Sequence, residues 1–302
     1  MRVIITGGTG LIGRALAGEL VAAGHQVIIL SRWAEQARRI PAGVEVVGWD
    51  ARMAHGWGHL ADGAGGIVNL AGENIGQGRW TADRKRRIRE SRLNAGQAVV
   101  EAVEGAAGRP QVVVQASGIG YYGPTGEEEI TKEAPPGADF LGRLAVEWER
   151  STQPVGRLGV RHVVIRTGVV LSAEGGALLR LMLPFRSFLG GSMGRGRQWF
   201  SWIHIVDEVQ AIRFLLENEA ASGPYNLAAP NPLTNGQFAR VLGRVMGWPA
   251  WLPTPAPALR LLLGEMSAVL LTGQRAVPRR LLEAGFSFRF PNLEGALEDL
   301  LR

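Results

Sequence analysis

Short apolar runs recur along the first 170 residues at intervals that suit the strands of a covered sheet. Each run is rich in Val and Ile and stays apolar at successive positions, so both faces of the strand are expected to be buried. A parallel sheet with helices on both sides buries its strands in this way. The predicted strands are 2–6 (RVIIT), 26–30 (QVIIL), 44–49 (VEVVGW), 66–71 (GIVNLA), 111–116 (QVVVQA) and 162–167 (HVVIRT).

Helical patterns separate several of these strands. Apolar residues recur at helical spacing over residues 11–24, 81–103 and 140–155, and Pro154 is expected to end the third helix. The alternation of strand and helix predicts an α/β fold, with a doubly wound, Rossmann-type parallel sheet.

The pattern changes after residue 170. A glycine-rich loop at 190–202 precedes a helix that opens at Asp207, which we interpret as its N-cap, with His204 closing a strand. An acid–base role for this pair is the alternative. A short strand is expected at 223–229, followed by helices with Pro-rich connections. We predict a Rossmann-type domain of residues 1–171 and 206–228, and a mostly helical lobe of residues 172–205 and 229–302 that covers the ligand-binding edge of the sheet.

Composition narrows the class of protein. The chain has 302 residues, 46% of them hydrophobic and 20% charged, which is typical of a soluble globular protein. It has no cysteine, which excludes disulfides and thiolate chemistry, and no cluster of residues suggests a metal site. No stretch resembles a secretion signal or a membrane span, because Glu265 interrupts the most apolar run. We expect a cytoplasmic protein.

The net charge of +6 raises the possibility of nucleic-acid binding. However, the chain has only two lysines, and its arginines are scattered except at 83–92. That run is better explained as the solvated face of a helix. We therefore expect neither a nucleic-acid nor a membrane partner.

The segment 6–13, TGGTGLIG, follows the first predicted strand and opens the first helix. Glycines at this place allow a tight turn and let the backbone approach a pyrophosphate, which the free N–H groups of the helix start can bind. The cofactor contacts expected from this loop are Gly7, Gly10, Leu11, Ile12 and Gly13.

The end of the second strand predicts which dinucleotide binds. NAD sites place Asp or Glu there for the ribose hydroxyls, but this chain has Ser31 and Arg32. A guanidinium and a hydroxyl attract a 2′-phosphate, so NADP(H) is favoured, unless Arg32 is an ordinary surface arginine. Asp50, after the third strand, either accepts a hydrogen bond from the adenine amine or caps a turn.

Several segments together resemble the extended short-chain dehydrogenase/reductases of the NAD-dependent epimerase/dehydratase superfamily, and within them the atypical "epimerase family protein" subgroup. The resemblance runs nearly from end to end of the chain. The segments that carry it are TGGTGLIG, VNLAGENI, QASGIGYYG, RWTADRKRRIRESR, FLGRLAVEWE, RTGVVLSAEGGAL, GRQWFSWIHIVDEV and LLTGQRAVPRRLLEAGFSFRFP.

The resemblance implies a Tyr-x-x-x-Lys pair for proton transfer, and this chain lacks it. In active relatives the lysine lowers the pKa of the tyrosine and binds the ribose. Here Phe140 and Leu144 occupy the corresponding positions, and no tyrosine is followed four residues later by lysine. The usual acid–base residues are therefore absent.

Ser117 falls where the superfamily places its hydroxyl, and Tyr121 and Tyr122 follow it in the loop near the expected nicotinamide. Either both rings pack the cofactor pocket, or one phenol, preferably Tyr121, donates a hydrogen bond to the substrate. Tyr122 is then a substrate contact. Without a neighbouring cation a tyrosine keeps a pKa near about 10, which suits a hydrogen-bond donor better than an acid.

Further contacts follow from position in the fold. The resemblance implies cofactor contacts from Leu70, Ala71 and Val170, and we add Ala116 at the end of the fifth strand. Arg92 is expected either to reach a phosphate or ribose, or to lie on the surface, with Arg89 on the same helix face.

The loop at 190–202 combines guanidinium and aromatic groups that can hold a planar or phosphorylated ligand. We expect Arg195, Arg197 and Trp202 to bind substrate, although two solvated surface arginines would look the same in sequence. Two functions remain open. One is an NADP(H)-dependent oxidoreductase or epimerase acting on a small, possibly anionic carbonyl or sugar-like compound; the other is a non-catalytic NADPH sensor.

Overall fold

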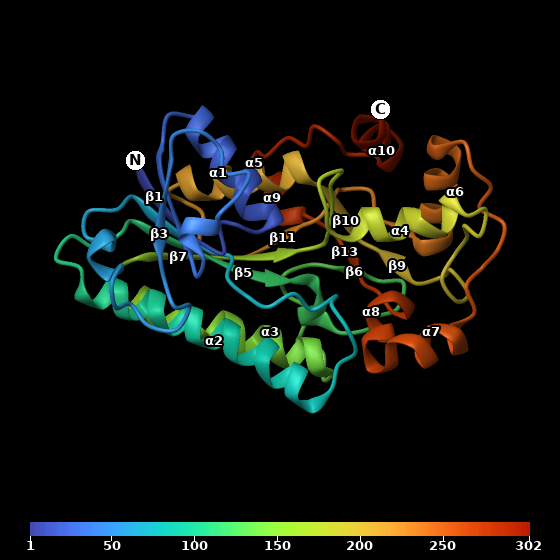
Figure 1. Cartoon of the computed structure of the whole chain (residues 1–302), viewed down its shortest axis with the longest axis horizontal. Helices are drawn as coiled ribbons and strands as arrows, with labels where there is room; N and C mark the ends of the chain where they lie inside the picture. The colour runs from blue at the N-terminus through green and yellow to red at the C-terminus, as the bar shows by residue number, and fades with distance from the viewer.

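The computed structural model describes all residues, 1–302, and contains the predicted parallel sheet. Seven parallel strands lie in the order β11-β7-β5-β4-β1-β2-β3 (Figure 1). The chain crosses from the β3 edge back to β4 beside β1, and such a reversal of strand order opens a crevice at the carboxyl ends of the strands. The strands are β1 (Arg2–Thr6), β2 (Gln26–Ser31), β3 (Val44–Gly48), β4 (Gly66–Asn69), β5 (Val112–Gly118), β7 (Arg161–Thr167) and β11 (Gly223–Leu227).

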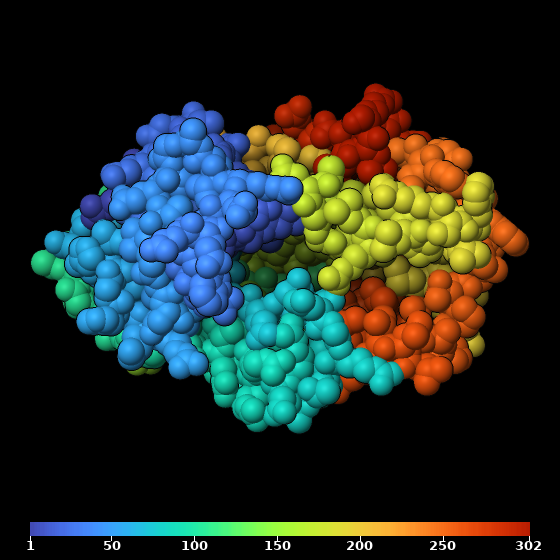
Figure 2. Space-filling model, viewed as in Figure 1, coloured from blue at the N-terminus to red at the C-terminus, as the bar shows by residue number.

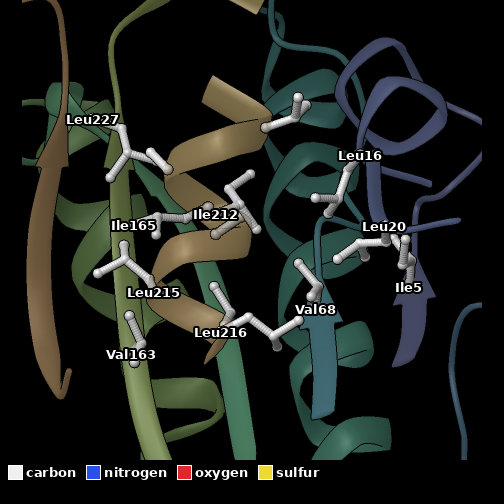
Figure 3. Packing of buried hydrophobic residues seen from close by; sticks show 14 of the residues in the cluster. Ile5, Leu16, Leu20, Val68, Val163, Ile165, Ile212, Leu215, Leu216 and Leu227 are labelled. Atoms are coloured by element: carbon white, nitrogen blue, oxygen red, sulfur yellow. The ribbon is translucent and has the colours of Figure 1, made fainter. Parts of the chain in front are cut away.

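Alternate residues of the strands face two separate cores. Ile5 on β1 faces α1 (Leu11–Ala22) and α5 (Ile205–Glu217), and Figure 3 shows this packing. Its neighbour Ile4 faces the other layer, where α2 (Ala82–Gly105) covers the sheet and α3 (Phe140–Ser151) packs on α2. The central strands are buried on both faces as predicted, whereas β3 is partly exposed because it is an edge strand.

Most of the remaining elements gather beyond the carboxyl ends of the strands, whereas α9 (Arg279–Glu283) packs against strand β11 of the sheet (Figure 1). Leu178, Phe238 and Leu297 join α4, α6 and α10 in a third core. The helices and strands outside the main sheet and its covering helices are α4 (Ala177–Arg186), α6 (Asn235–Met246), α7 (Ala256–Leu263), α8 (Ala268–Leu271), α9 (Arg279–Glu283), α10 (Leu293–Leu301), β6 (Glu129–Ile130), β8 (Val169–Leu171), β9 (Trp199–Phe200), β10 (Trp202–His204), β12 (Leu233–Thr234) and β13 (Arg275–Ala276). No helix is both long and apolar enough to cross a membrane.

Short strand pairs and 3₁₀ turns connect these elements. Strand β8 pairs with β10, β9 with β12 and β13 with β6. The 3₁₀ segments are η1 (Ala34–Gln36), η2 (Gly58–Ala61), η3 (Ile119–Tyr122), η4 (Gln153–Leu158) and η5 (Gly264–Ser267). The third predicted helix ends at Ser151, earlier than expected, and Pro154 lies in the first turn of the tighter 3₁₀ segment η4.

The end of the chain returns to the sheet. Leu281 and Phe286 are buried in the same core as Ile5 and α5. The Asp207 carboxylate accepts backbone N–H groups of Arg289 at 2.7 Å and Phe290 at 2.9 Å. The end of the chain is therefore tied to the sheet by apolar packing and by hydrogen bonds.

The predicted N-cap of α5 is wrong, although His204 does close strand β10. The helix begins at Ile205, and His204 caps it because its Nδ1 accepts the N–H of Val206 at 3.1 Å. Burial lowers the pKa of His204 to about 4 against the opposing effect of Asp299, so the imidazole is neutral and able to accept this bond. The Asp207 carboxylate instead accepts the backbone N–H groups of Arg289 and Phe290, and burial raises its pKa.

Candidate functional site

Two glycines of the loop are packed too closely against the backbone to be replaced by a residue with a side chain. Gly7 has a φ of 66°, and a Cβ there would lie 2.8 Å from the Leu70 backbone. A Cβ on Gly13 would lie 2.5 Å from the Cα of Gly8. These contacts bring the end of β1, the end of β4 and the start of α1 together at one point.

The first turn of α1 has free backbone donors. Its N-cap, Gly10, makes no side-chain cap, and the first bond of the helix is donated by Arg14 N–H to Gly10 O at 3.0 Å. The N–H groups of Leu11, Ile12 and Gly13 therefore have no acceptor within the helix. Donors at the positive end of a helix dipole, beside a loop with three glycines, fit a dinucleotide pyrophosphate.

A hollow lies at this edge of the sheet. Figure 2 shows it between the blue N-terminal part, the cyan segment that leads into α2 and the yellow-green segment around α4. The carboxyl ends of β1, β4, β5 and β7 meet the same region, because all strands of the sheet are parallel. A ligand held by the α1 turn would lie across these strand ends.

The end of β2 offers no carboxylate. Ser31 is buried and its hydroxyl accepts the Trp33 N–H at 3.2 Å, whereas Arg32 is exposed and unpaired. Asp50 caps a turn, since Oδ1 accepts the N–H groups of Arg52 at 2.8 Å and Met53 at 3.1 Å.

Arg92 is buried, so the surface alternative is wrong. Its guanidinium lies 4.6 Å from the Trp148 ring centre, and Nη1 donates to the carbonyl oxygens of Glu73 and Ile88 at 3.0 Å each. Burial, with a smaller effect from the charge of Arg84, lowers its pKa to about 10. Arg89 on the same helix is exposed and pairs with Glu147.

Arg92 also lies close to the predicted cofactor contacts at the end of β4. A Cβ on Gly72 would come within 3.0 Å of its guanidinium carbon. The Ala71 N–H donates to the Thr6 hydroxyl at 3.2 Å, and Leu70 is half-buried. The structure thus brings Leu70, Ala71 and Arg92 to one edge of the glycine loop.

Ser117 belongs to a buried polar network that sequence reasoning missed. Its hydroxyl donates to Oε1 of Glu149 on α3 at 2.7 Å. Arg166 on β7 binds both carboxylate oxygens of Glu149, through Nε at 2.8 Å and Nη2 at 2.9 Å. Burial alone would lower the pKa of Arg166, but hydrogen bonding and charge from Glu149 raise it above its ordinary value. The result is a buried, bidentate ion pair.

The two tyrosines have different surroundings. Tyr122 is buried; its hydroxyl donates to Asn226 at 2.6 Å and accepts from Arg166 at 3.1 Å. Burial raises the pKa of Tyr122 despite the opposing charge of Arg166. Tyr121 is half-buried, lies 3.4 Å over the Arg166 guanidinium, and its hydroxyl bonds to no protein group. Tyr121 is thus the phenol left available to a ligand.

Phe140 and Leu144, which we expect at the positions of the tyrosine and the lysine, are part of an apolar cluster. Leu144 is buried with Trp80, Ile88 and Met266, and the rings of Phe140 and Trp80 meet edge to face with their centres 5.1 Å apart. A charged lysine in this cluster would lack a partner.

The remaining predicted contacts lie on the second half of the chain, apart from Ala116, which is buried within β5. Val170 is half-buried on β8, and Arg195 and Arg197 are exposed and unpaired. Trp202, contrary to the prediction, is fully buried in the third core, because β10 turns this ring inward. It packs the fold and does not face a ligand.

The parallel sheet, the reversal of strand order and the uncapped glycine turn define a Rossmann-type dinucleotide-binding α/β protein. Comparison with known proteins assigns the chain more narrowly. The family model described as "NAD dependent epimerase/dehydratase family" matches residues 3–228, and a "Domain of unknown function (DUF1731)" matches residues 254–300. The chain belongs to the NAD dependent epimerase/dehydratase family.

Its relatives share the full length of the chain. It is 39% identical to the "Epimerase family protein YfhF" of Bacillus subtilis, covering 100% of this chain and 98% of that protein. It is likewise 39% identical to "Epimerase family protein SA0724" of Staphylococcus aureus, over 99% and 98% of the two chains.

Solved structures show the same fold. The human epimerase family protein SDR39U1 (isoform2), solved with NADPH, has a TM-score of 0.89 at 37% identity and covers 99% of both chains. A nucleoside-diphosphate sugar epimerase from Corynebacterium glutamicum has a TM-score of 0.80 at 33% identity, over 100% of this chain and 58% of that one. The Thermus thermophilus UDP-glucose 4-epimerase with NAD, at 19% identity and a TM-score of 0.80, shares the fold.

Proposed function

We propose that the protein is an NADP(H)-dependent oxidoreductase that acts on a small carbonyl compound or the corresponding alcohol. The observation that carries the proposal is the pairing of the uncapped α1 turn with an exposed, unpaired Arg32 and no carboxylate at the end of β2. A pyrophosphate and a 2′-phosphate would both find partners there. The human relative solved with NADPH supports the same choice.

The cofactor would supply or accept a hydride at its nicotinamide ring. Ser117 and Tyr121 at the end of β5 hold the substrate oxygen. The Ser117 hydroxyl donates to Glu149, so the serine oxygen is left to accept a hydrogen bond from a substrate hydroxyl. The free phenol of Tyr121 donates to the same oxygen when it is a carbonyl, with Arg166 beneath the ring.

The two parts of the chain and the remaining predicted contact residues are assigned to cofactor or substrate by their place in the fold. Residues 1–171 and 206–228 bind the cofactor, and residues 172–205 and 229–302 form the lobe that covers the substrate. Leu70, Ala71, Arg92 and Val170 surround the cofactor, with Ala116 behind it. Arg195 and Arg197 lie on the substrate side, exposed and unpaired.

A non-catalytic NADPH sensor is the second candidate. It is favoured by the apolar packing of Phe140 and Leu144, where active relatives carry tyrosine and lysine. Single-turnover oxidation of bound NADPH, followed by absorbance against a panel of carbonyl compounds and nucleotide sugars, separates the two. Oxidation by any member of the panel supports the enzyme, and tight NADPH binding without oxidation by any of them supports the sensor.

Arg32→Ala is expected to weaken NADPH binding by about 1.5 to 3 kcal/mol, the scale of a charge-assisted hydrogen bond. NADH binding should hardly change, because NADH lacks the 2′-phosphate. Titration calorimetry with both nucleotides measures the difference. Arg157→Ala is the matched control, since Arg157 is exposed but lies in η4, at the amino ends of the strands. Equal losses for NADPH and NADH would show that Arg32 does not bind the phosphate.

A further inference from the structure

A small cavity adjoins the candidate reaction site. Its volume is about 50 Å³, room for a few heavy atoms. Ile119 lines it two residues after Ser117, and Val169 lines it two residues after the end of β7. Trp199, Phe200 and Leu270 add apolar surface from β9 and α8. Along the chain, the lining thus begins two residues after Ser117 and two residues after the end of β7.

None of the lining residues is charged. The polar ones are already engaged within the protein. The amide of Gln198 donates to the carbonyl oxygens of Met193 at 3.0 Å and Leu270 at 2.8 Å. Ser201 donates to Gln274 O at 2.7 Å and accepts the Ala276 N–H at 3.0 Å.

The same holds for the other amides of the lining. Asn235 accepts the Met193 N–H at 2.7 Å, and Gln274 donates to Gly123 O at 2.7 Å. These bonds hold the walls of the cavity together and leave one uncharged polar atom on each of Gln198, Asn235 and Gln274 for a ligand.

An anionic group would be poorly accommodated here. Diphosphates and carboxylates in proteins are bound by Arg, Lys or several free N–H groups. An ion buried without such partners loses its hydration and gains no replacement. A short apolar group has no ionic hydration to lose, and it gains contact with the aromatic and aliphatic walls.

We propose that this cavity binds the uncharged, apolar end of the substrate, so that the protein acts on small aliphatic or aromatic carbonyl compounds and not on nucleotide sugars. The substrate class deepens the proposed function and rests on it. The cavity itself is a property of the fold and can be tested through binding alone.

The experiment uses the full-length protein, with and without NADPH, and three probes. Butanone is uncharged; pyruvate is a carbonyl compound of similar size with a carboxylate; UDP-glucose is a nucleotide sugar. Saturation-transfer NMR and competition titrations measure their binding. Butanone is expected to bind about tenfold or more tightly than pyruvate, the scale of one unfavourable group in an apolar pocket, and UDP-glucose is expected not to compete with it.

Val269→Trp fills the mouth of the cavity from α8. Val269 lines the cavity but is 41% exposed, so the larger ring can be accommodated without disturbing a core. Butanone affinity should fall about tenfold or more, with NADPH affinity and thermal unfolding unchanged. Leu262→Trp is the matched control, because Leu262 is 68% exposed on α7 and is not part of the lining. Leu262→Trp should leave butanone affinity, NADPH affinity and thermal unfolding unchanged.

The outcomes separate this inference from the proposed function. Failure of NADPH to bind overturns the proposed function, whereas butanone binding that responds to Val269→Trp supports the cavity even then. Tighter binding of pyruvate or UDP-glucose than of butanone overturns the inference. So does butanone binding that Val269→Trp leaves unchanged in a folded protein.

Discussion

Glu149→Ala is expected to lower the free energy of unfolding by about 3 to 5 kcal/mol, because it leaves the buried Arg166 guanidinium without its bidentate partner. Only 4% of the Arg166 side chain and 14% of the Glu149 side chain is exposed, so water cannot replace the lost bonds. The variant also removes the acceptor of the Ser117 hydroxyl. Urea titration followed by circular dichroism measures the change.

The same helix carries the control. Glu147 pairs with Arg89, and both side chains are exposed, so Glu147→Ala should cost less than about 1 kcal/mol. Comparable losses of unfolding free energy in Glu149→Ala and Glu147→Ala would show that burial does not increase the contribution of the Arg166–Glu149 pair to stability. Glu149→Gln, which retains one acceptor oxygen for Ser117, should fall between Glu149→Ala and the parent protein.

Glu208→Gln is expected to stabilise the protein at alkaline pH by on the order of 2 to 4 kcal/mol and to have little effect near pH 5. Glu208 is fully buried at the start of α5, and its Oε2 has no partner. Burial raises the pKa of its carboxyl from 4.5 to about 8, against the opposing hydrogen bond from Thr167. The folded state therefore keeps a proton that the unfolded chain releases, and stability falls as pH rises from 4.5 to about 8.

Thermal and urea unfolding between pH 5 and pH 9 tests this linkage. The stability of the variant minus that of the parent protein should grow with pH through this window, since all other titrating groups are common to both. Thr167→Val is a useful companion, because it removes the hydroxyl that donates to Glu208 at 2.8 Å and keeps the side-chain volume. A difference that stays constant over the whole range would contradict a raised pKa.

Much of the fold could be predicted from the chain alone because its signals are local. Six of the seven strands of the main sheet stand out as β-branched runs, and the seventh, β11, is a short strand whose edge position leaves it partly exposed. The glycine loop follows from the same reasoning, since its position between β1 and α1 depends only on neighbouring residues. The start of α5 was misplaced because a capping histidine is less common than a capping aspartate.

The buried network at Ser117 could not be predicted in the same way. Glu149 and Arg166 lie on different elements, and nothing in their spacing along the chain indicates that α3, which packs on β5, brings Glu149 to Arg166 on the neighbouring strand β7. One signal was available: Arg166 directly follows the apolar run at 163–165 in a buried strand, and a buried charge requires a buried partner. Which acid provides that partner becomes clear only from the tertiary structure. The inward position of Trp202 could not be predicted either, because the loop before it does not indicate which side of β10 faces the core.

The return of the chain's last part to the sheet affects how such proteins can diversify. The stretch 254–300 matches a family description of its own, yet Leu281 and Phe286 within it complete the core beneath α5, and Arg289 and Phe290 hold Asp207 through their backbone. Recombination that exchanged this stretch as a cassette would remove part of the nucleotide-binding half as well. The two halves are thus constrained to evolve together, and new specificities are expected to arise by point substitution around the cavity and not by shuffling of whole segments.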